Sequence, residues 1–495
     1  MNARTRVPQT VWTGLPLMGV LAGAASPLAV LLVRFVAQPA FDLSSLTPAL
    51  TFALFAAAVS CIVGGTLGAL AGTLEMPGRR SAVAVSAALI AAPPAFWWIG
   101  LTRLPAGFSR LSGAVSGGII AGVVLAPITL LLVLAASRET PSNAYEAARV
   151  SLAPARRFWF VLVPLLRPAL LAGFLLTAIL LLGESEIPFL FGFRTSMTDV
   201  VTTFSQTFDA ARTVPVIVPL VVAVLAIALA MVRPLFMVIL PAATGGRGVI
   251  RKPGRAWVTL GMFVLPAFVG LSLAGYGRAA LSGTADVWRR LPISVSTATI
   301  SIAEPVVCAL AAVALAVLAT YPIRRAGMVR SLAVVGLLLF CVPTAVVAIG
   351  WIAFGQALGG LSIAPGVAYV SRLAGLSVLG VLVAYARVPR SLEDAAQLVP
   401  LSPVRRAWTI VLPLVGTSLA AIAALSAALI FADRDVASLL LAPGESRLML
   451  NLYLLSANAP SAVIGATALM VFIAGGVVIA LAAAGPTALW LRRRE

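Results

Sequence analysis

The chain has 495 residues, of which 61% are apolar and only 10% are charged, and its mean hydropathy is +1.06. A soluble globular domain carries about 25% charged residues, so this composition excludes that class and predicts that most of the chain lies in lipid. The formal net charge of +19 would suggest a nucleic-acid partner for a soluble protein. In a membrane protein the basic residues are interpreted first as markers of topology.

Long apolar runs follow one another along the chain. A helix that crosses about 30 Å of hydrocarbon needs about 20 apolar residues, and it satisfies its own backbone hydrogen bonds without water. The pattern therefore predicts an all-α integral membrane protein with about twelve transmembrane helices. The expected spans are residues 11–36, 46–72, 81–102, 112–136, 164–183, 213–235, 256–276, 292–320, 328–356, 362–386, 413–431 and 460–487. The first run is interpreted as an uncleaved span and not as a signal peptide.

The distribution of basic residues predicts the orientation. If both termini are cytoplasmic, most of the 35 Lys and Arg residues fall in cytoplasmic segments. This is a positive-inside pattern, so the basic excess needs no nucleic acid to explain it. The three cysteines, Cys61, Cys308 and Cys341, lie in apolar runs without metal-ligand spacing, and the chain has no histidine. No metal site is therefore expected.

The two halves of the chain look like copies of each other. Residues 1–244 and 256–495 each hold six expected spans, and residues 245–255 (GGRGVIRKPGR) form a basic linker between them. Pro93 and Gly100 in the first half correspond to Pro343 and Gly350 in the second. Both halves begin on the same side of the membrane, which indicates a parallel repeat with the substrate path between its two members.

The longest polar stretch in each half repeats one pattern. The two stretches are residues 143–168 and 392–415. Pro154, Arg156, Arg157, Trp159 and Pro164 recur 249 positions later as Pro403, Arg405, Arg406, Trp408 and Pro413. In each copy, helix-forming residues are followed by a breaking proline, which predicts a short helical hook on the cytoplasmic face. The plain alternative is a pair of charged loops that obey the positive-inside rule.

These stretches resemble the EAA loop of binding-protein-dependent ABC-importer permeases, in a fused two-unit form similar to ferric-iron and thiamine transporter permeases. The match includes the endings VLVP and IVLP, and it departs where Leu152 and Leu401 replace the family's glycine. The resemblance implies that both loops couple to a separate ATPase. The implied coupling residues are Glu146, Ala147, Ala148, Arg156, Arg157 and Pro164, with Glu393, Asp394, Ala395, Ala396, Arg405, Arg406 and Pro413.

The chain has no ATP-binding motif of its own. A phosphate-binding loop needs Gly-Lys-Ser/Thr, but Lys252 is the single lysine and Pro253 follows it. We therefore expect a transport subunit that is not an enzyme and binds no cofactor, with ATP on the partner. The resemblance implies an ATP-binding-cassette dimer and an extracytoplasmic substrate-binding protein as partners. It also implies a multi-pass protein of the inner (plasma) membrane, surrounded by lipid, with no nucleic acid.

Five acids are candidates for an outer gate or a substrate path. Glu184, Glu186, Asp433 and Asp435 stand at the outer ends of two expected spans, where they meet either a solute or nearby arginines. Glu304 lies inside a span, and intramembrane acids are costly enough to count as functional candidates. Pro305, directly after it, suggests a local break in the helix.

Two other classes of function remain open at this point. GTLEMPGRR (residues 72–80) resembles the basic loop of major-facilitator transporters, which would make the chain a self-contained secondary transporter. A membrane scaffold without transport is the third class. The sequence names no substrate, whether ferric iron, thiamine or another small solute.

Overall fold

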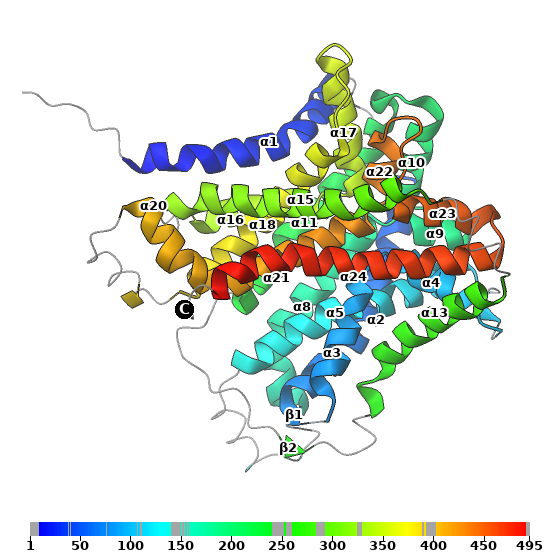
Figure 1. Ribbon diagram of the computed structural model, residues 1–495, viewed down its shortest axis with the longest axis horizontal. Helices are drawn as coiled ribbons and strands as arrows, with labels where there is room; N and C mark the ends of the chain where they lie inside the picture. Colours follow the sequence, from blue (N-terminus) through cyan, green and yellow to red (C-terminus); the bar gives the residue numbers. More distant parts are fainter. Residues whose placement is uncertain are drawn as a thin grey trace, which may run out of the picture. The chain divides into compact units, whose positions relative to one another are not determined.

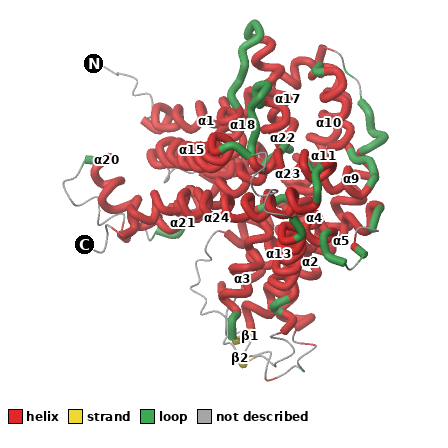
Figure 2. Tube along the Cα trace, turned by 45° about the vertical axis from the view of Figure 1, so that its right-hand side comes forward, coloured by secondary structure: helices red, strands yellow, loops and turns green. Residues whose placement is uncertain are grey.

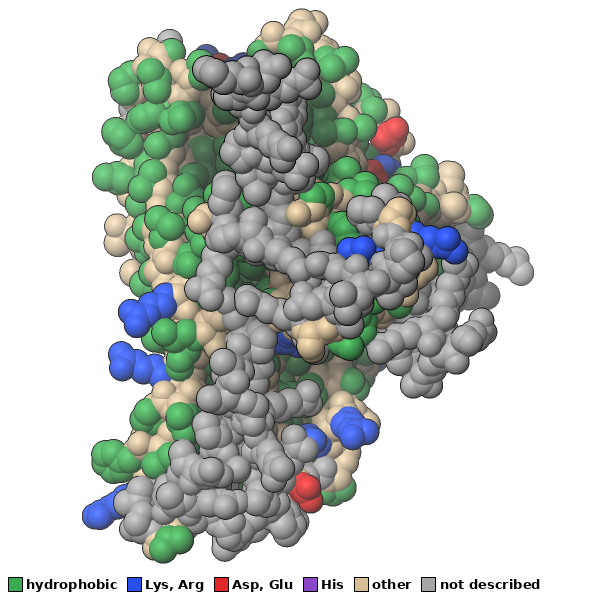
Figure 3. Space-filling model, turned by 90° about the vertical axis from the view of Figure 1, so that its left-hand side faces the viewer, with side chains coloured by type: hydrophobic (Ala, Val, Ile, Leu, Met, Phe, Trp, Pro, Cys, Tyr) green, Lys and Arg blue, Asp and Glu red, His purple; other side chains and the backbone are tan. Residues whose placement is uncertain are grey.

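The computed structural model describes residues 9–491, except 38, 40, 76, 106, 109–110, 140–149, 151–152, 154–155, 157, 240–251, 254–259, 284–292, 324–328, 389–390 and 393–401. Within these residues nearly all regular structure is helix (Figures 1 and 2). Ten of the described helices are long and apolar enough to cross a membrane, or up to twelve spans if two bent pairs each count as one. Hydrophobic side chains predominate on the face drawn in Figure 3. An all-α membrane protein is thereby confirmed.

Contacts divide the chain into two units. Unit 2 contains residues 38–292 and 451–471. Its elements are α2 (Leu46–Thr73), β1 (Leu74–Glu75), α3 (Arg79–Ala87), the 3₁₀ turn η1 (Ala88–Ala91), α4 (Pro94–Thr102), α5 (Gly113–Glu139), the π-helical turn η3 (Phe158–Leu162), α8 (Val163–Leu182), α9 (Glu186–Phe191), α10 (Ser196–Thr207), α11 (Ala210–Ile239), β2 (Lys252–Pro253) and α13 (Val264–Leu281). The two short strands pair in parallel.

Unit 1 contains residues 1–37, 293–450 and 472–495. Its elements are α1 (Gln9–Ala37), α15 (Val295–Thr320), the 3₁₀ turn η4 (Tyr321–Ile323), α16 (Val329–Cys341), α17 (Thr344–Ala357), α18 (Pro365–Ala386), α20 (Pro403–Arg406), the π-helical turn η5 (Ala407–Val411), α21 (Leu412–Ala432) and α22 (Asp435–Leu440). Helices α23 (Leu448–Asn458) and α24 (Ser461–Leu491) contain the residues at which the division falls.

Small residues hold α2 against α5 in unit 2. Ser60, Gly64, Gly68 and Gly72 recur every fourth residue and so share one face of α2. A Cβ atom at Gly64 would overlap the carbonyl oxygen of Ala126, so the two backbones touch there. Lipid tails are as apolar as leucine, and membrane helices therefore associate through such close approach and through hydrogen bonds between polar side chains.

A buried cluster of hydroxyl groups joins the same two helices to α8. The Ser60 hydroxyl lies 3.3 Å from the hydroxyls of both Thr129 and Thr177, and all three side chains are buried. Each hydroxyl can donate and accept, so the cluster satisfies polar groups that would otherwise be orphaned in a dry interior. It fixes the relative height of the three spans within unit 2.

Two of the expected spans, 81–102 and 328–356, are sharply bent in the structure. The helix before Pro93 meets α4 at 101°, and the helix before Pro343 meets α17 at 91°. Both prolines are extended, with ψ of 156° and 142°. Proline disfavours helical backbone in the residue before it, and Ala92 is accordingly extended. The break therefore occurs although the sequence stays apolar through both bends.

The first helix of each half packs on the bent pair of the other half. In unit 1, α1 packs on α17, where a Cβ atom at Gly350 would lie 2.7 Å from Pro27. In unit 2, α13 packs on α4, where Tyr276 donates a 2.5 Å hydrogen bond to the Phe96 carbonyl. Unit 1 therefore includes α1 from the first half of the sequence, and unit 2 includes α13 and residues 451–471 from the second half.

Candidate functional site

Most of the predicted coupling residues lie outside the described part of the chain. These are Glu146, Ala147, Ala148, Arg157, Glu393, Asp394, Ala395 and Ala396, with Leu152 and Leu401 beside them. Their coupling role therefore stays a prediction. The structure describes Arg156, Arg405 and Arg406 and the way in which the chain passes from them into the next spans.

Each of these passages contains one turn of π-helix. Phe158–Leu162 leads into α8 in unit 2, and Ala407–Val411 leads into α21 in unit 1. The two turns begin 249 residues apart, which is the offset of the repeated sequence pattern. Single π-helical turns are rare and occur frequently at functional sites. Their recurrence at matched positions marks both junctions as candidate functional elements.

Basic and aromatic side chains are exposed at both junctions. Arg156 and Arg405 are exposed, and Trp159 and Trp408 expose 65% and 58% of their surface. Arg406 is half-buried. An exposed tryptophan next to arginine suits a protein contact or the membrane interface, where an apolar ring and a polar group both find partners.

The two junctions differ at their prolines. Pro164 and Pro413 each stand second in the α-helix that follows the π-helical turn. Pro164 is exposed, whereas Pro413 is buried. The conserved feature of the two copies is thus their backbone path, while their packing differs.

The outer acids have a structural role at the start of two short helices. Glu184 Oε1 accepts hydrogen bonds from the backbone amides of Glu186 (2.7 Å) and Ile187 (3.3 Å) in α9. Asp433 Oδ1 accepts one from Val436 (2.9 Å) in α22. A carboxylate at a helix N-terminus satisfies free amides and complements the helix dipole. Helix capping therefore accounts for one acid of each predicted pair.

The second acid of each pair is largely buried. The Glu186 residue is 7% exposed. Asp435 pairs with Arg434 at 3.2 Å, and their side chains are 13% and 9% exposed. Arg194, which follows Glu186 by eight residues, pairs with Asp199 at 3.0 Å.

Glu304 forms an ion pair with Arg447 across unit 1. Arg447 Nε lies 2.7 Å from Glu304 Oε2, and the two side chains are 15% and 17% exposed. The expected break at Pro305 is wrong, because α15 runs through it without interruption. Neighbouring spans hold a transmembrane helix together where proline removes one hydrogen bond, and α15 packs on both α18 and α21.

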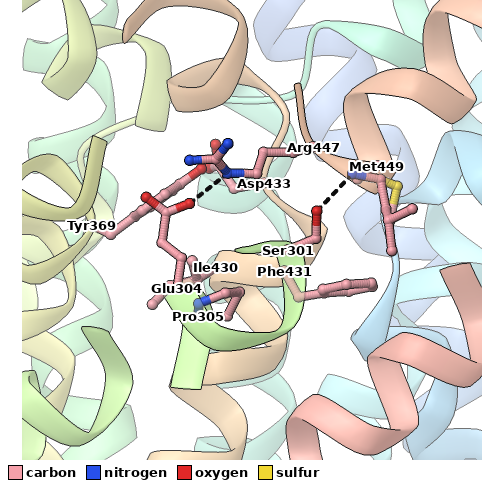
Figure 4. Close-up of a pocket in the computed structure, with 10 residues that line it drawn as sticks. Ser301, Glu304, Pro305, Tyr369, Ile430, Phe431, Asp433, Arg447 and Met449 are labelled. Atoms are coloured by element: carbon pink, nitrogen blue, oxygen red, sulfur yellow. Dashed lines mark hydrogen bonds and ion pairs between the residues drawn. The ribbon is translucent and has the colours of Figure 1, made fainter. Parts of the chain in front are cut away.

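Glu304 and Arg447 line a small pocket, shown in Figure 4. The pocket has a volume of about 20 Å³, which is room for one water molecule. Its other polar walls are Ser301 and Tyr369, from α15 and α18, and Asp433. Ser301 Oγ accepts a 3.0 Å hydrogen bond from the Leu448 amide, so the start of α23 is tied to α15 in two places. Within the described residues, no group of three or more Asp, Glu and Cys side chains is placed to hold a metal ion.

Asp433 directly follows the span Ala407–Ala432 and faces charges from two helices. Burial raises the pKa of its carboxyl to about 7, and the neighbouring Asp435 carboxylate contributes to the rise. The Arg372 guanidinium on α18 and the Val436 amide oppose it. The Asp433 carboxyl therefore holds its proton to a higher pH than an ordinary aspartate does.

Sequence reasoning missed two polar residues of this region. Arg372 lies in the expected span 362–386, and its guanidinium stands 5.4 Å from the centre of the Phe340 ring. Tyr369, one helical turn before it, reaches the pocket. Arg372 could have been identified from the sequence, since an arginine within an apolar run is a functional candidate. No signal identified Tyr369.

The position in unit 2 that matches Glu304 is apolar. The residue 249 positions before Glu304 is Phe55, and its ring lies against Gly118. The rings of Phe52 and Phe193 in the same unit are tilted against each other with their centres 5.0 Å apart. The Glu304–Arg447 ion pair therefore has no counterpart at the matching positions of unit 2, which hold Phe55 and Thr198.

Loss of the Glu304 carboxylate is expected to destabilise the protein by about 2–3 kcal/mol, because it leaves Arg447 partly buried without its partner. The measurement is thermal unfolding of E304Q, R447Q and the double variant E304Q/R447Q. The double variant should lose less than the sum of the two single variants. R194Q, which breaks the exposed Arg194–Asp199 pair, is the control and should change stability by less than about 1 kcal/mol. Additive effects of E304Q and R447Q would contradict a coupled pair.

No protein-family model matches the chain, and no curated protein matches it at a significant level. The class rests on the fold alone: this is a multi-pass helical membrane protein. Its described residues present two matched π-helical junctions and one buried charged pocket.

Proposed function

We propose that the chain is the transmembrane permease subunit of an ATP-driven ABC importer, built as two tandem six-helix units. The observation that carries the proposal is the pair of π-helical junctions with exposed Arg and Trp. The same 249-residue offset separates the starts of α8 and α21 and those of α9 and α22, and this supports duplication of the whole unit. The paired bends at Pro93 and Pro343 support it independently.

The proposed partners follow from what the chain lacks. Its sequence has no phosphate-binding loop, so an ATP-binding-cassette dimer must supply ATP hydrolysis. A binding protein outside the membrane would deliver the solute, and the proposed location is the inner (plasma) membrane with both termini in the cytoplasm. In this scheme each junction fixes one coupling loop to the first turn of a span, so a force on the loop moves a long helix directly.

The mechanism is alternating access. Closure of the ATPase dimer around ATP would draw the two coupling loops together and change the relative stability of the inward and outward forms. Nucleotide shifts that equilibrium only as far as it binds the two forms with different affinity. The five acids Glu184, Glu186, Glu304, Asp433 and Asp435 are proposed to line the outer gate or the path, with Glu304 best placed because it faces a pocket.

Affinity purification tests the proposal. The tagged chain, extracted from its native membrane in mild detergent, should retain an ATP-binding-cassette subunit, and the complex should hydrolyse ATP. Reconstituted alone in liposomes, the chain should show no flux driven by an ion gradient. Gradient-driven flux from the chain alone would instead establish a secondary transporter of major-facilitator type, the class to which a buried charged pocket would also be suited.

A further inference from the structure

The pocket of unit 1 contains charged side chains in a largely buried position, where removing a charge from water costs free energy. Glu304 lies ten positions into a 26-residue apolar helix, and a charged side chain inside a membrane is stable only with a partner. Here the partner comes from a distant part of the chain, since Arg447 precedes α23. An apolar pair at these two positions would pack without any charge to desolvate, and replacement of a buried ion pair by apolar residues is often neutral or stabilising. Packing alone therefore does not require the ion pair.

The Tyr369 hydroxyl is the second unusual feature of the pocket. Tyr369 is 5% exposed and lines the pocket, yet within the described part of the chain its hydroxyl has no hydrogen-bond partner. Because Tyr369 lines the pocket, its hydroxyl can accept a hydrogen bond from a donor placed there. Figure 4 shows the Tyr369 ring beside the facing Glu304 and Arg447 side chains. The Tyr369 oxygen is therefore an available hydrogen-bond acceptor at the place where the Arg447 side chain enters the pocket.

The acids outnumber the bases among the residues that line the pocket. The two acids are Glu304 and Asp433, and the single base among the lining residues is Arg447. Two further arginines lie outside the lining of the pocket. The Arg372 guanidinium on α18 interacts electrostatically with Asp433, and Arg434 forms an ion pair with Asp435. A cation that replaced Arg447 would leave the charge of the pocket unchanged, whereas an anion would add to two carboxylates.

We propose that this pocket is a binding site for a guanidinium or ammonium group of a solute, and that the side chain of Arg447 occupies the site in the solute-free protein. Glu304 would accept the main hydrogen bond, and Tyr369 and Asp433 would accept others. Entry of the solute would displace Arg447 and, with it, the segment whose Leu448 amide is bound to Ser301. The inference deepens the proposed transport function by naming a substrate class, an organic cation.

Guanidinium rescue of a vacated pocket tests the site. The protein variant is R447A, purified at pH 8 to favour the ionised form of the Asp433 carboxyl, whose pKa is raised by burial. Melting temperature is followed by tryptophan fluorescence while guanidinium chloride is raised through the low millimolar range, with sodium chloride at equal ionic strength as the control. We expect R447A to melt below the wild type and guanidinium to restore at least half of the loss with a saturable dependence.

Two controls make the rescue specific. The double variant E304A/R447A keeps the cavity but lacks the main acceptor, so guanidinium should not stabilise it. The wild type, in which the cation must first displace Arg447, should be stabilised only at higher guanidinium concentrations than R447A requires. Absence of a saturable rise in R447A, or an equal rise in E304A/R447A, would show that Arg447 has only a structural role.

A second measurement covers the case in which R447A does not fold. A fluorophore is placed at the exposed position 445 by E445C, with Cys61, Cys308 and Cys341 replaced by alanine. Methylguanidinium should change its emission saturably, and E304Q should remove the change; an identical response in E304Q would overturn the proposal. Neither measurement involves ATP or uptake, so the cation site and the importer can fail separately.

Discussion

Charge reversal of either arginine pair, R156E/R157E or R405E/R406E, is expected to reduce solute uptake at least tenfold while ATP hydrolysis by the partner continues. Each pair precedes a π-helical junction, and Arg156 and Arg405 are exposed, so they are available to a docking surface. A charge-assisted contact that turns into a repulsion loses several kcal/mol, and about 1.4 kcal/mol already corresponds to a factor of ten. Uptake and ATPase activity are measured on the same preparation of the complex.

The matched control is R324E/R325E. This double variant reverses another adjacent arginine pair in a segment expected on the cytoplasmic side, with the same change in net charge. Uptake should stay within a factor of two of the wild type. If both junction variants transport as well as this control, the coupling role of the junctions is refuted.

Substitution of Gly64 by valine is expected to lower the stability of the protein by about 3 kcal/mol and to reduce the yield of folded protein. The first added carbon would overlap the Ala126 carbonyl oxygen, which belongs to a backbone that cannot turn aside as a side chain can. Helices α2 and α5 would then have to separate along the stripe of small residues, and overpacking of this kind usually costs 1–3 kcal/mol. Thermal unfolding in detergent measures the effect.

Gly19 provides the control for this substitution. It lies in α1, another long apolar helix, and an added Cβ atom there would have no heavy atom within 4 Å. G19V should therefore change stability by less than about 0.5 kcal/mol. Equal destabilisation by G19V and G64V would indicate that loss of helical glycine as such, and not the contact with Ala126, is responsible.

The spans were predictable because lipid imposes a length and a composition on any helix that crosses it. The expected run 46–72 is α2 (Leu46–Thr73), and 362–386 is α18 (Pro365–Ala386), each within three residues. The bends at Pro93 and Pro343 were missed because hydropathy is unchanged through them. A proline inside a helix is tolerated at Pro305 and breaks it at Pro93, so residue type alone does not decide the outcome.

The functional regions were predictable only in part. The matched pattern around Arg156 and Arg405 located the two junctions, but no periodicity indicates a π-helical turn. Glu304 was identifiable as an acid in an apolar run. Its partner was not, because Glu304 and Arg447 are 143 residues apart and meet only when α15 and α23 are in place. Long-range pairing is a property of the tertiary structure.

The position of α1 has a consequence for synthesis of the chain. Arg34 donates a 3.2 Å hydrogen bond to Gln356, which lies 322 residues later in the sequence. The first helix therefore leaves the ribosome long before its packing partner exists, and it must wait in the bilayer with its contact face covered by lipid or by an insertion factor. Proteins fold more slowly as contacts span longer stretches of chain. Residues 1–244, expressed as a separate chain, would therefore lack the partner of their own first helix.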